Sequence, residues 1–154
     1  TSWTHEKELL HPTPGASDYF GYSVSISADG NYAIVSAYQD NGSAGSAHVF
    51  ARGLRDGTPW IHQAQLLHPN PAGTDRFGYS VSISADGTVA LVGAVLDDTG
   101  GADAGSAHVY VRNGTSWTHE KELLHPTPAT LDNFGFNVSI SGDGKYALVG
   151  APLR

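Results

Sequence analysis

Histidine is the residue type in this chain best suited to chemistry, because a neutral imidazole binds transition metals and can move a proton near neutral pH. The chain has eight histidines in 154 residues. They fall into three sets of equivalent positions: His5, His62 and His119; His11, His68 and His125; and His48 and His108. His5 and His11 are too far apart within one segment to share an ion without a further ligand. A functional site seldom recurs in every copy of a repeat, so we predict structural or surface histidines and no metal site.

Acidic residues offer a second kind of chemistry. Asp97, Asp98 and Asp103 share a loop with flexible glycines and could gather around a calcium ion, which takes several oxygen ligands. The corresponding loop of the preceding copy has only Asp40 and Asn41. We therefore predict that this loop is a solvated turn.

Three other aspartates, Asp18, Asp75 and Asp132, each stand two residues before a Phe-Gly pair. We expect them to accept backbone N–H hydrogen bonds in a turn. No Ser–His–Asp set, Gly-rich phosphate loop or isolated carboxylate pair stands out. The sequence therefore predicts no catalytic residue and no cofactor, and it identifies no ligand-binding residue.

The segments that carry these residues recur at a fixed period of 57 residues. The period is set by two groups of positions, which we interpret as structural: Trp3, Trp60 and Trp117, and the pairs Phe20-Gly21, Phe77-Gly78 and Phe134-Gly135. A constant spacing indicates one supersecondary unit copied along the chain, each copy burying its apolar faces against the next. Residues 1–14 recur unchanged at 115–128, which indicates recent duplication or design.

Each unit contains four short stretches typical of strands. Residues 20–27 alternate between bulky and small side chains, and 32–37 are apolar throughout, as in a strand covered on both faces. Residues 46–52 form a third stretch. The fourth, 60–67 and its counterpart 117–124, is more polar and suits an outer edge strand. Four antiparallel strands that grade from an inner to a charged outer strand are the pattern of a β-propeller blade.

The predicted fold is therefore all-β, with about 2.75 propeller blades in a single segment. We expect the last strand of a blade in 1–14, blades at 15–71 and 72–128, and the first two strands of another blade in 129–154. Strands are expected at 3–10, 134–141 and 146–151. Because a propeller needs roughly four to eight blades to close, we do not expect a closed monomeric ring. The expected partners are copies of the chain or flanking blades of a longer parent chain.

The run from Phe77 to Ala94, together with Leu148-Val-Gly-Ala-Pro152, resembles the FG-GAP repeats of integrin α-subunit-like propellers. The resemblance implies a propeller scaffold used for adhesion or ligand binding, in an extracellular, cell-surface or periplasmic location, and it implies no activity. Calcium-binding members carry a longer acidic loop between the first two strands. Here that loop has shrunk to one Asp-Gly turn per copy, so the chain is more similar to the calcium-free, Trp-containing branch.

Composition excludes two classes of partner. The net charge is −7, and the 8 Lys and Arg form no basic cluster, which excludes a nucleic-acid footprint. No stretch approaches the roughly 18 consecutive apolar residues needed for membrane insertion. Asn41 and Asn113 match the N-glycosylation pattern in predicted loops, whereas Asn137 is expected to be inaccessible in an inner strand.

These observations leave three functional interpretations. The first is a non-enzymatic module for binding, adhesion or structural assembly, with a protein or glycan ligand. The second is a lectin-like propeller whose Trp, Tyr and His side chains stack on sugars. The third is an artificial or duplicated repeat scaffold that self-assembles, which the identical 14-residue segments favour.

Overall fold

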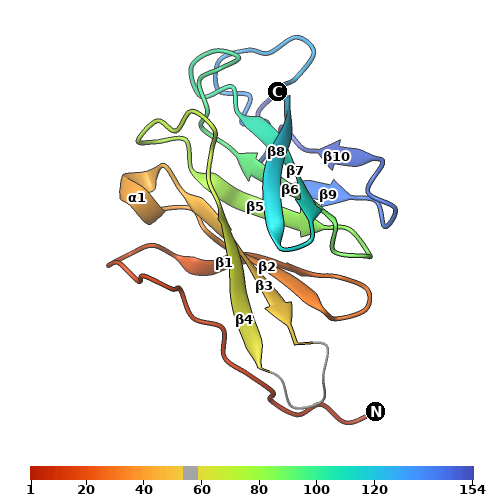
Figure 1. Cartoon of the computed structure of the whole chain (residues 1–154). Helices are drawn as coiled ribbons and strands as arrows, with labels where there is room; N and C mark the ends of the chain where they lie inside the picture. The colour runs from red at the N-terminus through yellow and green to blue at the C-terminus, as the bar shows by residue number, and fades with distance from the viewer. Residues whose placement is uncertain (54–58) are drawn as a thin grey trace.

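Three antiparallel sheets follow one another along the chain (Figure 1). The computed structural model describes residues 1–53 and 59–154. Blade 1 contains β1 (Phe20–Ile26), β2 (Tyr32–Ala37), β3 (Ser46–Arg52) and β4 (Trp60–Leu66), with the one-turn helix α1 (Asp40–Ser43) between β2 and β3. Blade 2 contains β5 (Phe77–Ile83), β6 (Val89–Ala94), β7 (Ser106–Asn113) and β8 (Ser116–Leu123). Blade 3 contains β9 (Val138–Ile140) and β10 (Ala147–Val149). The predicted all-β class and four-stranded blade pattern are confirmed.

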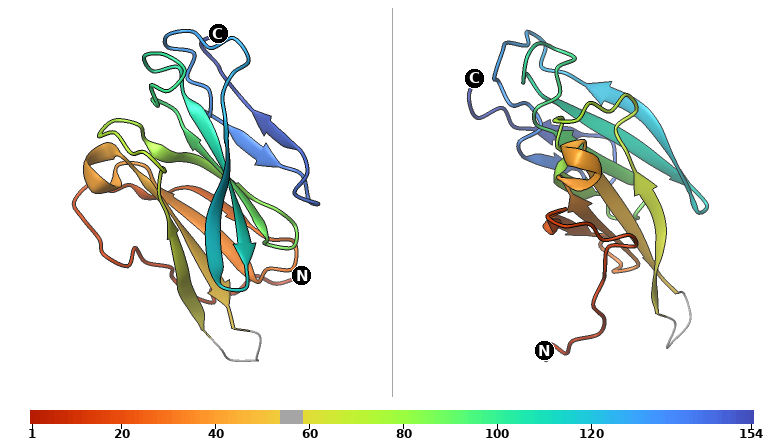
Figure 2. Two further views of the ribbon diagram at one scale, coloured as in Figure 1. Left: turned by 45° about the horizontal axis from the view of Figure 1, so that its top comes forward. Right: turned by 90° about the vertical axis from the view of Figure 1, so that its left-hand side faces the viewer.

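Within each four-stranded blade the strands lie in sequence order, so every pair is joined by a hairpin connection. The inner strands β1, β5 and β9 pack against one another between blades, and the further views show the three sheets side by side (Figure 2). Blades of this kind bury their faces against neighbours rather than around a private core. The described helix is far too short to cross a membrane.

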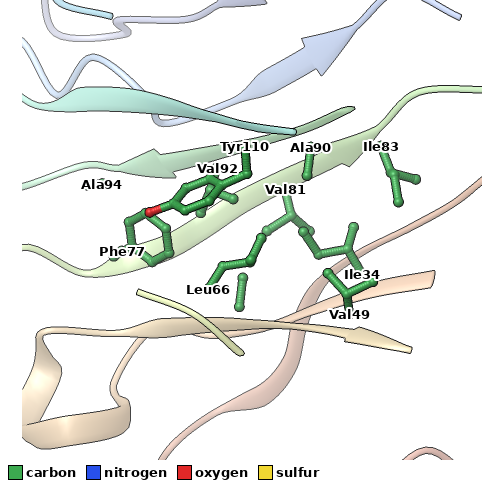
Figure 3. Close-up of a cluster of buried hydrophobic side chains, with 11 residues drawn as sticks. Ile34, Val49, Leu66, Phe77, Val81, Ile83, Ala90, Val92, Ala94 and Tyr110 are labelled. Carbon is green, nitrogen blue, oxygen red and sulfur yellow. The ribbon is translucent and has the colours of Figure 1, made fainter. Parts of the chain in front are cut away.

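The main hydrophobic core lies between blade 1 and blade 2 (Figure 3). Ile34, Val49 and Leu66 project from blade 1 toward Phe77 and Val81 of blade 2. Phe77 is fully buried, and its ring makes edge contacts with Tyr110. Apolar side chains of β2, β3, β4 and β5 therefore form the contact between blades 1 and 2.

Small residues let the inner strands approach closely. Ser23 and Ser25 of β1 accept hydrogen bonds from the backbone N–H groups of Val81 and Ile83, at 3.1 and 3.2 Å. The next pair of blades repeats the arrangement, with Val138 N to Ser80 Oγ at 2.8 Å and Ile140 N to Ser82 Oγ at 3.0 Å. Each blade thus supplies hydroxyl acceptors to the inner strand of the blade that follows it.

The Phe-Gly pairs lie at the same contact. Gly78 has a φ of 87°, and a side chain on it would collide with the carbonyl oxygen of Ser46 in blade 1. Gly135 meets Ser106 of blade 2 in the same way. Gly21 has a φ of 90°, but no atom lies within 4 Å of the place where its Cβ would be. Gly78 and Gly135 thus permit close contact with the preceding blade. Beside Gly21 the equivalent space is open.

The strict alternation expected over 20–27 is interrupted. A bulge shifts the register between Phe20 and Val24, and another does so between Phe77 and Ser80. Strands β9 and β10 have three residues each, shorter than the predicted 134–141 and 146–151. A two-stranded sheet has little support from neighbours, which accounts for the shorter pairing.

The strand predicted at 3–10 is not formed in the structure. Residues 2–9 are identical in sequence to β8, which pairs with β7, whereas residues 3–10 have no third strand beside them. Trp3 is consequently 94% exposed. Trp117 packs partly against the core, and its Nε1 donates to Gln63 of blade 1 at 2.9 Å. Trp60, expected to lie against neighbouring blades, is half-buried.

The three glycosylation motifs agree with expectation only in part. Asn41 and Asn113 are both exposed, Asn41 in α1 between two strands and Asn113 as the last residue of β7 rather than in the predicted loop. Asn137 was expected to be inaccessible, but it is also exposed. It precedes the shortened β9 rather than lying within a paired strand, which explains the difference.

Candidate functional site: buried histidine and aspartate clusters

Two clusters of polar side chains lie at equivalent places in blades 1 and 2, and in each of them all members except the last histidine are buried. Cluster 1 consists of His11, Asp40, Ser46, His48 and His62, and cluster 2 consists of His68, Asp97, Ser106, His108 and His119. Asp40 and Asp97 are buried, so the solvated turn predicted for this loop is wrong at both positions. Asp98 and Asp103 lie nearer the surface in the same loop.

Different elements bring the members of cluster 2 together. His68 comes from the connection after β4, in which Pro69 prevents further pairing of the strand. Asp97 starts the loop after β6, and Ser106 and His108 project from the same face of β7. Cluster 2 therefore joins the end of one blade to the middle strands of the next.

In both clusters hydrogen bonds link the serine to the histidine of the third strand and that histidine to the one of the fourth strand. In cluster 2, His68 Nε2 lies 3.1 Å from Asp97 Oδ2, and Ser106 Oγ lies 2.8 Å from His108 Nε2. His108 Nδ1 lies 3.1 Å from His119 Nε2. Cluster 1 repeats this geometry, and there Ser46 Oγ donates directly to Asp40 Oδ2 at 2.7 Å.

The His11–Asp40 contact of cluster 1 is longer than its counterpart. His11 Nε2 lies 3.4 Å from Asp40 Oδ2, and this buried nitrogen has no hydrogen-bond partner among the described residues. The carboxylate is instead held by Ser46 and by Gln65 Nε2 at 3.3 Å.

A backbone N–H determines the tautomer of His68, the histidine that links blade 1 to blade 2. Asn70 N donates to His68 Nδ1 at 3.1 Å, so Nε2 carries the proton that points at Asp97. Thr13 makes the same bond to His11. A metal ligand needs a free lone pair on the coordinating nitrogen. Although His68, Asp97, His108 and Glu122 gather their ligand atoms within 4.8 Å, the proton on His68 Nε2 favours hydrogen bonding over coordination there.

Each cluster contains a Ser–His–Asp set that was not predicted from the sequence. The loop between the aspartate and the serine differs in length, running from Asp40 to Ser46 in one copy and from Asp97 to Ser106 in the next. The detectable signal is a Ser-x-His pair at the start of the third strand in the first two copies. Ser46 is fully buried and directs its proton to Asp40 rather than to His48. It therefore lacks both the access and the hydrogen-bond direction of a catalytic nucleophile.

The third copy of the cluster is different. Arg154 stands at the position that corresponds to Asp40 and Asp97. Its guanidinium binds Asp132 Oδ2 at 3.0 Å and Thr127 Oγ1 at 2.8 Å. The His–Asp pair of the first two copies therefore has no counterpart at His125.

Burial and hydrogen bonding shift the pKa values of cluster 2. Burial alone would raise the pKa of Asp97, but the polar groups of His108, His68 and Ser106 around the carboxylate hold it far below its ordinary value. Burial opposes protonation of His68, yet the hydrogen bond and the charge of Asp97 raise its pKa overall. Desolvation lowers the pKa of His119, and the nearby histidines lower it further. Asp97 is thus held as a buried carboxylate, and His68 Nε2 donates its proton to it.

In cluster 1 the most shifted group is His48. Its side chain is almost completely buried, which lowers its pKa to about 4, with smaller contributions from His11 and His62. The unfolded chain takes up this proton near pH 6.5, so it binds more protons than the folded chain between pH 6.5 and pH 4. The contribution of His48 to stability is therefore present above pH 6.5 and decreases as the pH falls.

We expect His48→Asn to weaken the pH dependence of stability. From pH 7.5 to pH 5, His48 should account for a loss of about 2 kcal/mol in the free energy of unfolding. His68 acts in the opposite direction, because its raised pKa favours folding at low pH and this contribution is lost as the pH rises. Urea unfolding of both proteins at the two pH values measures the difference. An equal loss in the variant and the wild type would contradict it.

The aspartates before the Phe-Gly pairs lie in turns that lead into the inner strands. Asp75 Oδ2 accepts a hydrogen bond from Ala72 N at 2.6 Å, and Asp132 Oδ2 accepts one from Ala129 N at 2.7 Å. The carboxylate of Asp18 accepts one from Gly15 N. Burial raises the pKa of Asp75. Their backbone contacts are those of residues that shape a turn.

The Asp-Gly turns use their single carboxylates internally. Asp29 Oδ1 accepts from Ser27 Oγ at 2.6 Å and from Asn31 N at 2.9 Å, and these bonds lower its pKa. Equivalent bonds are made by Asp86 and Asp143. One carboxylate already engaged in this way offers too few oxygen ligands for calcium.

We therefore expect the melting temperature to be the same in excess EDTA and in millimolar calcium. A ligand that bound the folded state alone would appear as added stability. Thermal melts monitored by circular dichroism provide the measurement, with magnesium as the matched control for general ionic effects. An increase of more than a few degrees with calcium would show that a calcium site exists.

An aromatic row lies on the inner strands, away from the clusters. Tyr22, Tyr79 and Phe136 occupy equivalent positions, and neighbouring ring centroids are 5.1 Å apart. Tyr38 contacts both tyrosines of the row. A cavity of about 250 Å³ is lined by the row together with Ser23, Ser80 and Asn137. This is a surface hollow where apolar rings and polar groups meet.

Comparison with known proteins gives one family. A family model described as the FG-GAP repeat matches residues 3–50, 60–110 and 117–154. Each matched segment begins at one of the repeated tryptophans and, in the first two copies, ends in the third strand of the next sheet. The sequence repeat therefore starts with the outer-strand segment of one blade and continues into the following blade. No curated protein matches the chain.

Proposed function

Because the chain belongs to the FG-GAP repeat family, we propose that it is a non-enzymatic binding or structural module of a surface or secreted protein. FG-GAP repeats form propeller-like modules that are common in binding and adhesion proteins and typical of extracellular or surface proteins. The observation that best supports the proposal is the use of the Ser–His–Asp sets. Both sets are buried inside their blades, so the residues with catalytic potential serve the scaffold.

Two assays test this proposal together. Panels of chromogenic esters, amides, phosphates and glycosides should show no turnover above buffer. A turnover that disappeared in the Ser46→Ala, Ser106→Ala double variant would contradict the non-enzymatic interpretation. A solid-phase array of extracellular matrix proteins and glycans should reveal a saturable ligand. No binding to any immobilised partner would argue against a binding role and leave a structural one.

The aromatic row favours carbohydrate as a second candidate ligand. Aromatic faces pack against the apolar faces of sugar rings, and hydroxyl and amide groups such as those of Ser80 and Asn137 can bind sugar hydroxyls. A glycan array should then give a signal that Phe136→Ala abolishes. Tyr146→Ala is the matched control, because Tyr146 is exposed and does not line the cavity. Equal binding by both variants would exclude the hollow as the sugar site.

A further inference from the structure

We propose that a cavity between blades 1 and 2 binds a short, uncharged peptide segment of small residues, presented by a partner protein. The cavity lies where the loop that contains α1 faces the connection from β4 to β5 (Figure 1). The site rests on the proposed binding function and gives it a location and a class of ligand. At the next contact along the chain, a loop of the protein itself occupies the corresponding place.

The cavity has the size of a ligand-binding pocket. Its volume is about 550 Å³, within the roughly 300–1,000 Å³ typical of such pockets. Asn41 and Gln65 lie on the blade 1 side, and Pro71, Ala72 and Gly73 form the wall on the connection to blade 2. All of them lie at the contact between two blades of the chain, so the outer faces of blades 1 and 3 contribute nothing to the cavity.

The cavity exists because the loop after β2 is shorter than the loop after β6. Both loops are closed by the same hydrogen bond, from Gly45 N to Asp40 O in blade 1 and from Gly105 N to Asp97 O in blade 2, each at 2.9 Å. These ends are five positions apart in blade 1 and eight in blade 2, so blade 2 has three more residues between them. The two loops therefore begin and end alike and differ only in the middle.

The longer loop fills the corresponding place between blades 2 and 3. Gly100 lies against the connection after blade 2, since a Cβ on Gly100 would stand 2.9 Å from the Cβ of Pro128. Pro71 is the counterpart of Pro128, and it lines the open cavity instead. A stretch of small residues, Thr99–Ala102, thus occupies at one contact the space that is open at the other.

The polar groups left at the cavity match those of a peptide bond. Leu131 N donates to a carbonyl oxygen of the longer loop at 2.9 Å, whereas the N–H of its counterpart Thr74 bonds to no acceptor among the described residues. On the other side, Asn41 and Gln65 each direct a side-chain N–H to Asp40. Their amide oxygens receive no hydrogen bond within the part of the chain that the structure describes. A donor and two acceptors are therefore available to a ligand that carries both C=O and N–H groups.

The lining also limits the charge and size of the ligand. None of the described residues that line the cavity is Asp, Glu, Lys or Arg. His68 lines it too, but its ring nitrogens are bonded to Asp97 and Asn70. A charged ligand would lose hydration here without gaining a partner. Gly101 of the longer loop has a φ of 137°, which glycine readily adopts. The ligand that fits is therefore an uncharged segment that contains glycine.

Nuclear magnetic resonance titration of the isotope-labelled chain tests the proposal with a defined probe. The probe is the acetylated and amidated tetrapeptide Thr-Gly-Gly-Ala, which has the sequence of residues 99–102. We expect saturable shifts of the backbone amide signals of Gly73 and Thr74, with the Thr74 signal moving downfield because its N–H gains an acceptor. The same peptide with valine in place of both glycines is the control. It should not cause these shifts, because a side chain at the first glycine would collide with the proline of the cavity wall.

Gly73→Phe should close the cavity and leave the loop in place. A Cβ at Gly73 would meet only the carbonyl oxygen of Gly42, at 3.9 Å, and Thr130 carries a side chain at the same position of the next copy. The variant should therefore fold, and it should bind the peptide at least about tenfold more weakly than the wild type does. Thr130→Phe is the matched control, because it adds the same ring where the longer loop already fills the space. It should bind the peptide as the wild type does.

Shortening the loop of blade 2 should create a second site. Replacing residues 98–103 by the Asn-Gly-Ser sequence of residues 41–43 gives this loop the length of its counterpart in blade 1. The peptide should then also shift the amide signal of Leu131, whose acceptor is removed in this variant. A Leu131 signal that did not respond to the peptide would show that loop length does not make the site.

The absence of any saturable shift in the wild type at millimolar peptide would overturn the proposal. Equal binding by Gly73→Phe and Thr130→Phe would overturn it as well. Both results concern the cavity alone. A partner from the solid-phase array that bound Gly73→Phe and the wild type equally would leave the proposed binding function in place, and it would exclude the cavity as the site of that function.

Discussion

Gly78→Ala should lower the free energy of unfolding by about 3–5 kcal/mol, whereas Gly21→Ala should lower it by only about 1–2 kcal/mol. Both glycines have φ near 90°, so the two variants share the cost of a left-handed alanine. They differ in what the new methyl group meets. At Gly78 it collides with the carbonyl oxygen of Ser46, and no rotamer change can move a backbone atom away. At Gly21 the methyl group enters open space.

Urea unfolding at a low protein concentration, where association does not add to stability, measures both free energies. Gly135→Ala provides a second comparison, because its methyl group would meet Ser106 in the same way. Equal destabilisation by Gly78→Ala and Gly21→Ala would show that the backbone conformation alone requires glycine. The close contact between blades would then have no role in the requirement.

Asp97→Ala should lower the free energy of unfolding by about 3–5 kcal/mol, because the buried donors that bond to its carboxylate would be left without an acceptor. His68 would lose the acceptor of its Nε2 proton. Thr99, whose backbone N–H and hydroxyl both bond to Asp97 Oδ1, would lose its partner as well. The effect spans two blades, since His68 belongs to the connection that leaves blade 1.

Glu120→Ala is the matched control, because Glu120 is an exposed carboxylate of β8 in the same blade. Its removal should change the urea midpoint very little, as expected for surface charges. Asp97→Asn separates charge from hydrogen bonding, since the amide keeps one acceptor oxygen. If Asp97→Ala shifted the midpoint no more than Glu120→Ala, the buried cluster would not stabilise the fold.

Much of the architecture could be predicted because the same residues recur at one period. The bounds of β2 and β3 agree with the predicted 32–37 and 46–52. The small residues of the predicted alternation include the serines whose hydroxyls lie at the contact between blades. A repeated pattern carries more information about pairing than any single strand does.

The buried clusters could not be predicted by the same reasoning. Their members come from a connection, a loop and two strands, and the loop changes length from one copy to the next. The two identical 14-residue segments show a second limit. One forms β8 beside β7, and the other, which has no neighbouring third strand, forms none. Local sequence sets the capacity to form a strand, but a partner decides whether the strand exists.

The serine contacts between blades also bear on how the chain folds. Each joins residues 58 positions apart, whichever pair of blades it connects. The loop that must close before two blades can meet therefore has the same entropy cost at every step. Adding further copies would lower the relative contact order, since the chain lengthens while the separation of contacting residues stays constant. Folding could then nucleate in any blade and propagate to its neighbours, at a rate per blade that does not depend on how many blades follow.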